Sequence, residues 1–291
     1  MKTAVVTDST AKLSQEIVDK YGIKVVSIPF IIDGHEYHDG IDITNKEFYD
    51  KLSKAKEFPT TSQPPVGEMI KVYNQLAEEG YDAVVSIHLA GTISGLIQTL
   101  NNLKDQLDNI DLYPVDSSIT EVPMSWMVIK AAQMAQAGKA PQEIVDEVHT
   151  LEKQYDAIFV VDDLKNLAHG GRLSNASAFI GTVLKIKPLL HFDKETDKIT
   201  AFEKVRSIKR AMKRAEELIF EEIADADYPV RLMVIHANSK KRGEELVAEL
   251  EERHPGISVS LSEFDPVIAV HLGEGAIALG YIRDIEKDPQ D

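Results

Sequence analysis

The chain has 291 residues, enough for two domains of ordinary size, and 43% of them are hydrophobic. Its formal net charge of −16 argues against nucleic acid as the main partner and against general adhesion to anionic membranes, because both need clustered cations. The absence of cysteine excludes disulfides, thiolate nucleophiles and cysteine-based zinc sites. The sequence has no apolar run near the ~18 residues of a membrane span, and its start lacks the apolar length of a signal peptide. These features predict a soluble, cytoplasmic protein.

Strands and helices alternate along most of the chain, which is typical of an α/β fold with a parallel sheet. The first part predicts strands over 3–6, 23–32, 81–88 and 112–115, with helices over 14–22, 44–52, 66–79, 94–107, 124–136 and 142–154. Asp33-Gly34 predicts a hairpin turn, and Thr44 with Glu47 predicts a capping box for the helix over 44–52. The second part predicts a strand over 157–161, a helix over 176–184, a hairpin of 188–192 and 198–202, a helix over 207–223, and strand, helix and strand over 231–236, 240–253 and 257–264. We therefore expect two α/β lobes. An N-terminal three-layer, Rossmann-like domain covers residues 1–155, and a second, smaller α/β domain covers 156–291.

Hydroxyl groups and backbone amides gather just ahead of the helix predicted at 66–79. This first donor segment, Pro59–Pro65, contains Thr61 and Ser62. A helix start carries unpaired amide donors and the positive end of the helix dipole, so it attracts anions. The alternative is a simple helix cap, but the segment offers more donors than one cap needs.

A second donor segment, Ala90–Gly95, follows the buried strand at 81–88. In open α/β sheets, ligands bind beside such turns at the carboxyl ends of the strands. Ser94 is either an N-cap or a hydroxyl donor to a carboxylate, with the amide of Gly95 beside it. Two donor segments in one half of the chain predict a buried site for one small anionic head group.

A nucleophilic Ser94 is the enzymatic alternative, with His271 as a candidate base in a serine hydrolase or acyltransferase. The order Gly91-Thr92-Ile93-Ser94-Gly95 places the serine one position late for a G-x-S-x-G elbow. Neither G-x-x-x-x-G-K-[ST] nor G-x-G-x-x-G occurs, so no nucleotide cofactor is expected. His35 and His38 lie in a predicted hairpin, where solvated side chains are more typical than a metal site, so no metal is expected either.

Three further segments of the second half combine glycine, histidine or cations in patterns that suit a binding surface. Arg172 follows a glycine turn at 170–171 and can reach an anion or a partner, although an incidental surface arginine has the same pattern. The run 204–214, which includes Arg206, holds six cations in eleven residues; it is either a solvated helix face or a docking surface for an acidic partner or a lipid head group. His271 lies in the apolar segment 266–276, which we interpret as a strand that runs into a glycine turn.

Together these segments resemble the DegV family of bacterial fatty-acid-binding proteins, of the type that serves as the binding subunit of a fatty acid kinase. The resemblance covers nearly the whole chain and rests on five segments in order. They are Val6–Thr10, Thr61–Pro64, Ser94–Gly95 ahead of a helix, Gly170–Leu173, and Pro266–Gly275 with His271.

The resemblance implies a non-enzymatic carrier that holds one long-chain fatty acid, such as palmitate or oleate, in a buried tunnel between its lobes. It places carboxylate contacts on Thr61, Ser94 and His271, with Ser62 and Gly95 beside them. It implies roles in lipid transport, fatty acid metabolism and phospholipid synthesis, in which a separate ATP-dependent kinase converts the acyl carboxylate to an acyl phosphate. Arg172 and Arg206 match arginines of the surface that faces the kinase or, transiently, the membrane.

The chain departs from the family pattern near the head-group segments. Leu96 stands where threonine is frequent, and Ala90 and Gly91 stand where serines are frequent. Val270, Leu272 and Glu274 likewise replace common threonines and a proline. The apolar stretch Phe179–Leu184 is either a tunnel wall or ordinary core. A protein-interaction module built around the basic run 204–214 is a third function that the sequence leaves open.

Overall fold

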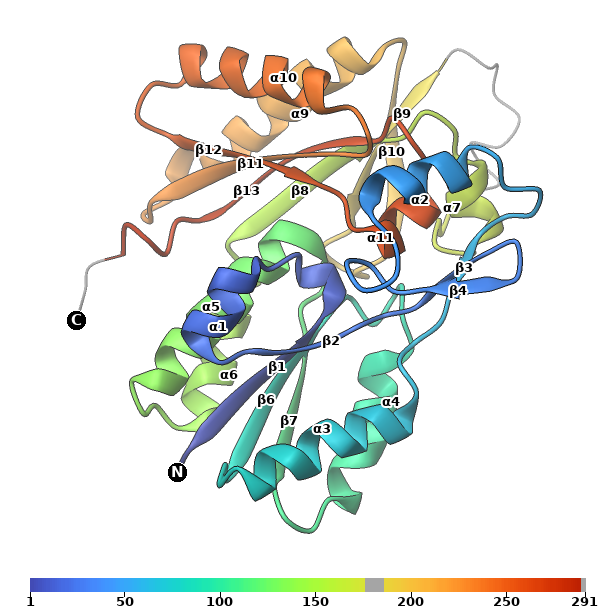
Figure 1. The fold of residues 1–291 in the computed structure, drawn as a ribbon. Helices are drawn as coiled ribbons and strands as arrows, with labels where there is room; N and C mark the ends of the chain where they lie inside the picture. Colours follow the sequence, from blue (N-terminus) through green and yellow to red (C-terminus); the bar gives the residue numbers. More distant parts are fainter. Residues whose placement is uncertain (176–185, 289–291) are drawn as a thin grey trace. The chain divides into compact units, whose positions relative to one another are not determined.

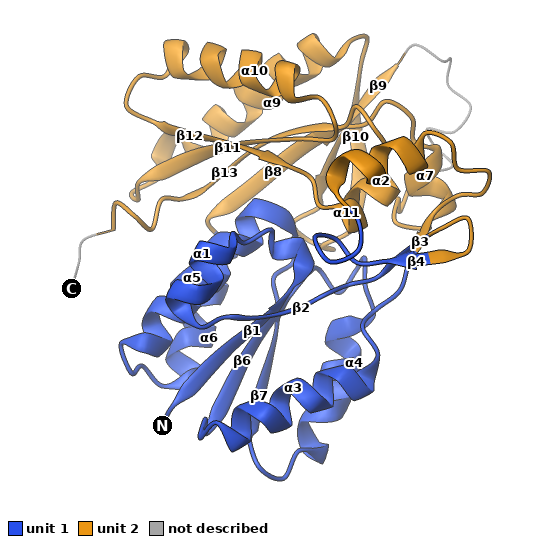
Figure 2. Ribbon diagram, viewed as in Figure 1, with its two compact units in different colours: residues 1–31, 36–43, 61–153 blue, residues 32–35, 44–60, 154–291 orange. Residues whose placement is uncertain are grey.

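The computed structural model describes residues 1–175 and 186–288, and these form two compact units (Figures 1 and 2). Unit 1 comprises residues 1–31, 36–43 and 61–153. Unit 2 comprises residues 32–35, 44–60 and the described part of 154–291. Residues 44–60 therefore group with the second half of the chain and not with their neighbours in sequence.

Unit 1 is built on a four-stranded parallel sheet of order β2-β1-β6-β7. Its strands are β1 Thr3–Asp8, β2 Lys24–Val26, β6 Ala83–His88 and β7 Asp111–Asp116. Every residue of β1 and β6 is buried, as the nearly continuous apolar runs of central parallel strands predict.

Helices cover both faces of this sheet, so the expected three-layer α/β/α arrangement is confirmed. One face carries α1, α5 and α6, and the other carries α3 and α4 (Figure 1). The helices are α1 Gln15–Tyr21, α3 Val66–Glu78, α4 Leu96–Leu103, α5 Glu121–Gln136 and α6 Pro141–Leu151, with short 3-10 turns at Ser9–Ala11 and Lys104–Gln106.

A small three-stranded sheet of order β4-β3-β5 contains three of the five points at which the chain passes from one unit to the other. Its strands are β3 Phe30–Ile32, β4 His35–Tyr37 and β5 Thr60–Thr61. The strand predicted over 23–32 is in fact two strands, β2 and β3. Pro29 lies between them, and proline has no amide hydrogen for a ladder. The predicted turn at Asp33-Gly34 is confirmed by positive φ angles of 48° and 78°.

Unit 2 contains a six-stranded mixed sheet of order β10-β9-β8-β13-β11-β12. β11 pairs parallel with β12, and the pairs β10–β9, β9–β8, β8–β13 and β13–β11 are antiparallel. The strands are β8 Tyr155–Val160, β9 Lys187–Phe192, β10 Ile199–Val205, β11 Val230–His236, β12 Ser258–Glu263 and β13 Ile277–Arg283. The predicted hairpin across residues 193–197 is therefore confirmed.

Two amphipathic helices, α9 Ile208–Glu222 and α10 Lys240–Arg253, lie on one face of this sheet (Figure 1). Apolar side chains of both helices form a buried core with the strands beneath them, including Met212, Ile219 and Leu250. The other helices of unit 2 are α2 Asn45–Leu52, α7 Lys165–His169 and α11 Pro266–Leu272, and a short 3-10 turn at Ile223–Asp225 follows α9. The predicted capping box of α2 is present, with reciprocal bonds between Thr44 and Glu47.

The strand expected over 266–276 is wrong, because its first residues form the helix α11. Asp265 caps this helix by accepting from the amide of Val267 at 2.8 Å, and Pro266 occupies its first position. A buried helix and a buried strand both appear as a continuous apolar run, so periodicity did not separate them. The predicted helix over 176–184, with its Phe179–Leu184 stretch, lies outside the described residues.

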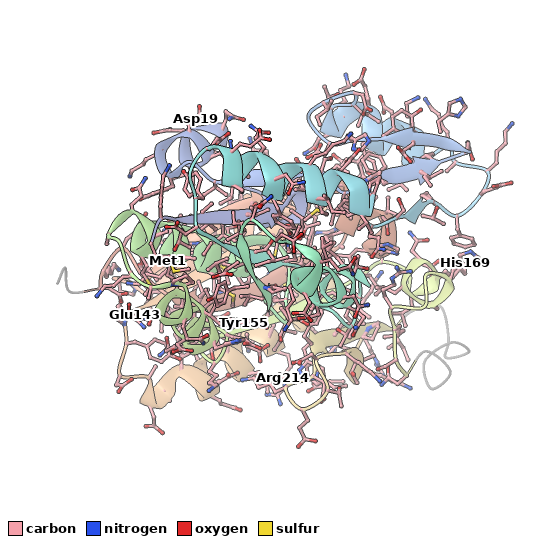
Figure 3. All side chains as sticks on the ribbon, turned by 90° about the horizontal axis from the view of Figure 1, so that it is seen from below. Met1, Asp19, Glu143, Tyr155, His169 and Arg214 are labelled. Atoms are coloured by element: carbon pink, nitrogen blue, oxygen red, sulfur yellow. The ribbon has the colours of Figure 1, made fainter. Side chains whose placement is uncertain are left out.

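Charged side chains such as Asp19 of α1 and Glu143 of α6 are exposed on unit 1 (Figure 3). None of the described helices combines the length and the apolarity needed to cross a membrane.

Candidate functional site

Three strands of unit 1 end side by side at the carboxyl edge of the sheet. The register pairs Thr7 with Ile87, and it pairs His88 with Asp116. Asp8, His88 and Asp116, the last residues of β1, β6 and β7, therefore meet at this edge, from which the second donor segment leaves β6. Ligands of open α/β sheets bind at such an edge.

The fully buried carboxylate of Asp8 holds this edge together. Its Oδ1 accepts from the amide of Thr10 at 3.0 Å and from the Thr10 hydroxyl at 2.6 Å. Its Oδ2 accepts from the amide of Leu89 at 3.1 Å and lies 3.0 Å from Nδ1 of His88. A buried carboxylate is tolerated only when several donors satisfy it, and here those donors belong to two different strand ends.

The hydrogen-bond chain continues from His88 into the core. Nε2 of His88 lies 2.8 Å from Oγ of Ser86, which lies 2.9 Å from the hydroxyl of Tyr73. Burial raises the pKa of Tyr73, so its phenol stays protonated. The side chains of Asp8, His88 and Ser86 form a hydrogen-bond chain in the same order as the acid, base and nucleophile of a catalytic triad. All three side chains are completely buried, however. A substrate cannot reach Ser86, so this network positions the strand ends.

Asp116 fixes the start of the second donor segment. Its two carboxylate oxygens accept from the amide of Gly91 at 3.1 and 3.0 Å, and Oδ1 also accepts from the amide of Ser118 at 2.9 Å. A Cβ at position 91 would lie 2.6 Å from Oδ2 of Asp116. A side chain at position 91 would therefore displace the Asp116 carboxylate from these amide hydrogen bonds.

The two donor segments lie close to each other at Gln63 and Gly95. The side chain of Gln63, in the first segment, accepts at Oε1 from the hydroxyl of Thr99 on α4 at 3.2 Å. The same oxygen would lie 3.4 Å from a Cβ at Gly95, in the second segment. The segments that carry Thr61 and Ser94 are thus held side by side.

The local structure around the four predicted residues of unit 1 differs in detail from the expectation. Thr61 is half-buried in the strand β5, several residues before α3 begins, and Ser62 is exposed with its amide bonded to Pro29 O at 3.2 Å. The N-cap of α4 is Gly95 and not Ser94. Ser94 is half-buried, and its Oγ accepts from the amide of Leu96 at 3.3 Å.

In unit 2, the glycine turn at 170–171 packs against His271, in the last turn of α11. A Cβ on Gly170 would lie 2.8 Å from Nδ1 of the imidazole. The Arg172 guanidinium donates a hydrogen bond to the carbonyl oxygen of Gly170. The structure therefore brings His271 and Arg172 to the same turn, although they are about a hundred residues apart in sequence.

Burial, and to a smaller extent the neighbouring positive charge of Arg172, lowers the pKa of His271 to about 4. Burial also lowers the pKa of Arg172, but an arginine remains charged at neutral pH. His271 is consequently a neutral imidazole at pH 7, with one N–H to donate and one nitrogen to accept.

Arg206 is exposed between the end of β10 and Ser207, the N-cap of α9. In the described part of the chain, no group of three or more His, Asp or Glu side chains is arranged to hold a metal ion.

Sequence reasoning missed the residues that position the site. Asp8 belongs to the segment Val6–Thr10, but its contact with His88 depends on the register of two strands that are 80 residues apart. The contacts Asp116–Gly91 and Gly170–His271 are also tertiary. The one signal for these positioning residues in the sequence is the polar residue that ends each of the strands β1, β6 and β7.

Comparisons with known proteins agree with this architecture. A family model described as "Uncharacterised protein, DegV family COG1307" matches residues 2–284. A DegV domain-containing protein of Listeria innocua is 41% identical over 278 residues, which cover 96% of this chain and 97% of the relative.

Two solved structures are similar over nearly the full length. DegV from Bacillus subtilis, described as a fatty acid binding protein, is 40% identical with a TM-score of 0.88, and the match covers 98% of this chain and 100% of that chain. A fatty acid binding DegV family protein from Streptococcus agalactiae is 37% identical with a TM-score of 0.90, and the match covers 98% of this chain and 99% of that chain.

The contact between Gly170 and His271 leads to a prediction about the imidazole pKa. Gly170→Ala should displace the ring from its buried position, so the pKa of His271 should rise from about 4 toward its ordinary value of 6.5. An NMR titration of the imidazole signals measures this shift directly. Gly67→Ala is the control, because a Cβ at position 67 meets nothing within 4 Å. An unchanged His271 titration in a folded Gly170→Ala variant would show that the glycine does not position the ring.

Proposed function

Since the chain belongs to the DegV family, we propose that it binds one long-chain fatty acid, such as palmitate or oleate. The observation that supports this proposal is the position of Gln63 of the first donor segment, which lies beside Gly95 of the second and bonds to Thr99 on α4. In this proposal Thr61 and Ser94 are the main contacts of the acyl carboxylate, with Ser62 and Gly95 beside them and His271 as a further contact.

The donors suit a carboxylate that is held without a full positive charge. The Ser94 hydroxyl accepts from Leu96, and a hydroxyl that accepts one bond can donate another. Gly95 precedes α4 and brings the amide-rich start of this helix to the same place. Hydrogen bonds to the charged form favour that form, so they offset the cost of burying the head group.

A neutral His271 supports a binding role in this proposal. An imidazole with a pKa of about 4 donates one N–H hydrogen bond to a carboxylate at pH 7. The same pKa makes it a poor general base near neutral pH, since efficient bases have pKa values close to the working pH. This counts against the serine hydrolase or acyltransferase alternative with Ser94 and His271.

The acyl tail supplies most of the proposed affinity. Burying a methylene contributes ~0.8 kcal/mol, so a long chain contributes on the order of 10 kcal/mol before ordering costs. The polar head then fixes orientation more than affinity, so a change at one hydroxyl should weaken binding without abolishing it.

We further propose that the bound acid is presented to a separate ATP-dependent kinase, which transfers the γ-phosphoryl group to the carboxylate and releases ADP. In this role the protein serves fatty acid metabolism and phospholipid synthesis. Arg206 is assigned to the surface that faces the kinase because it is exposed and flanks the cationic start of α9. Arg172 is assigned to the same surface by the family resemblance.

Palmitate affinity tests the head-group assignment. Ser94→Ala and Thr61→Val should each weaken binding by about fivefold to tenfold, because each removes one hydrogen bond to a charged group. Isothermal titration of delipidated protein measures the effect, and Thr150→Val on the surface of α6 is the matched control.

Unchanged palmitate affinity in both site variants, or no saturable binding to the parent protein, would contradict the proposal. The enzymatic alternative makes the opposite prediction: an activated ester would be turned over, and Ser94→Ala would abolish that turnover.

The kinase assignment is tested separately with protein that has been loaded with palmitate. Arg206→Glu should slow ADP formation by an ATP-dependent fatty acid kinase by about tenfold, since reversing a charge at an interface slows association. Palmitate binding should not change. Lys198→Glu, an exposed charge reversal on the β9–β10 hairpin, is the control. Equal rates for the Arg206 and Lys198 variants would refute the assignment of Arg206.

A further inference from the structure

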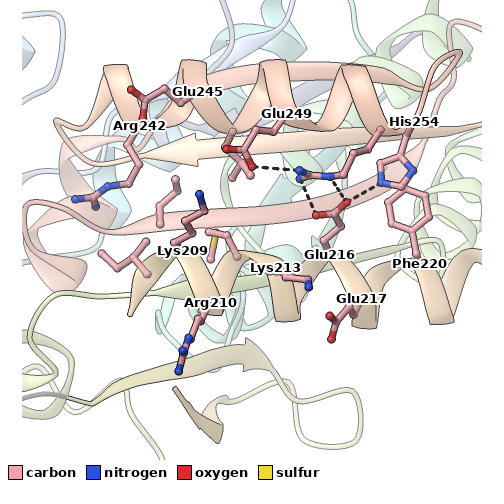
Figure 4. A pocket seen from close by; sticks show the side chains of 15 residues that line it. Lys209, Arg210, Lys213, Glu216, Glu217, Phe220, Arg242, Glu245, Glu249 and His254 are labelled. Carbon is pink, nitrogen blue, oxygen red and sulfur yellow. Dashed lines mark hydrogen bonds and ion pairs between the residues drawn. The ribbon is translucent and has the colours of Figure 1, made fainter. Parts of the chain in front are cut away.

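An open groove of about 1060 Å³ runs between α9 and α10 on the outer side of the unit 2 core (Figure 4). Its floor is apolar and is formed by Ile208, Met212, Leu246 and Ile277. The part of α9 that borders it, from Ile208 to Phe220, is about 18 Å long at ~1.5 Å per residue.

A bridge of side chains closes one end of the groove. Oε2 of Glu216 on α9 accepts from Nη2 of Arg253 at 2.8 Å, and its Oε1 lies 2.7 Å from Nε2 of His254. The His254 ring stacks on Phe220 with a centroid separation of 3.8 Å. Figure 4 shows this bridge at one end of the groove, with Lys209 and Arg242 toward the other end.

The acids that line the groove already have cationic partners. Glu216 and Glu249 pair with Arg253 at 2.8 and 3.2 Å, Glu217 pairs with Arg214 at 3.3 Å, and Glu245 pairs with Lys241 at 3.9 Å. Their negative charge is therefore largely offset within the protein.

Three cations on the α9 side are in the opposite situation. Lys209, Arg210 and Lys213 line the groove, are exposed, and form no ion pair with any residue in the described ranges 1–175 and 186–288. The lining thus carries uncompensated positive charge, although the whole chain has a net charge of −16.

These cations are also poorly placed for the stability of their own helix. Lys209 and Arg210 lie in the first turn of α9, which has no acidic residue, and cations near a helix N-terminus interact unfavourably with the dipole. Lys209 and Lys213 are four residues apart and repel each other. An anionic partner would relieve both effects.

We propose that this groove binds an acidic amphipathic helix of a partner protein. The open groove lies at the upper limit of the volumes of enclosed small-ligand pockets and is as long as three turns of helix. A helix laid between α9 and α10 would place a narrow apolar stripe on the floor and carboxylates beside the three cations. This is the helix-in-groove mode of recognition, with charge complementarity selecting the partner.

The probe is a designed, fluorescently labelled helical peptide of about 14 residues with leucines along one face and glutamates on both flanks. Fluorescence anisotropy should show saturable binding that weakens as salt increases. Lys209→Gln combined with Lys213→Gln should lower the affinity by about fivefold to tenfold, as expected for the loss of two exposed charge pairs. Lys198→Gln combined with Lys240→Gln removes the same charge outside the groove and should leave the affinity nearly unchanged.

Two control peptides separate charge from apolar contact. Replacing the glutamates by glutamines should weaken binding at least as much as the double lysine variant does, because Arg210 also loses its partner, and replacing the leucines by alanines should abolish it. A peptide with a photoreactive group in place of one leucine should label Met212 or Leu246. The measurement uses neither fatty acid nor kinase, so its failure leaves the proposed function intact.

Several results would overturn the proposal. Equal affinity for the glutamate and glutamine peptides would remove the role of charge. An equal loss in the two double variants would show a general effect of net charge. If vesicles of phosphatidylcholine and phosphatidylglycerol bind through Lys209 and Lys213 while the peptide does not, the surface recognises lipid. If the protein dimerises through these lysines in sedimentation experiments, its partner is a second copy.

Discussion

The buried carboxylate of Asp8 is the constraint on which the geometry of unit 1 depends. It satisfies the amide and hydroxyl of Thr10 after β1 and the amide of Leu89 after β6, and it holds the ring of His88. Removing it would leave several buried donors without an acceptor, which costs more than a typical hydrogen bond contributes. The second donor segment leaves the sheet at this fixed point, and Asp116 then holds its first turn through Gly91. The position of Ser94 is therefore set by carboxylates that would not themselves touch an anionic ligand.

The two units combine polar groups in different ways. Near its donor segments, unit 1 offers hydroxyls and amides, and the carboxylates of Asp8 and Asp116 are held in internal hydrogen bonds. Unit 2 keeps the imidazole of His271 neutral beside a charged Arg172, since burial and the neighbouring cation both lower its pKa. Its excess positive charge lies elsewhere, at the start of α9. These differences separate the proposed recognition of a lipid head group from the proposed recognition of an acidic helix.

Much of the fold could be predicted from local patterns in the sequence. The apolar runs of β1 and β6, the capping box at Thr44 and Glu47, and the turn at Asp33-Gly34 have causes that lie within a few residues of each other. The predictions failed where the deciding contact was distant or ambiguous. The continuous apolar run after Asp265 fits a buried strand as well as the helix that it forms. Within the site, Thr61 and Ser94 could be selected for their chemistry, but the partners that position the site depend on strand register and tertiary packing.

The central claim is that neutral donors hold the charged head of a fatty acid. The most direct measurement is the carboxyl ¹³C NMR signal of [1-¹³C]palmitate bound to the protein, followed from about pH 8 to pH 5. Donors that favour the charged form keep the carboxylate ionised below its ordinary pKa, so the account predicts one bound signal at the ionised shift across this range. Ser94→Ala should move the midpoint upward. A bound signal that titrates inside this range in the parent protein would show that burial outweighs the donors, and would contradict the account.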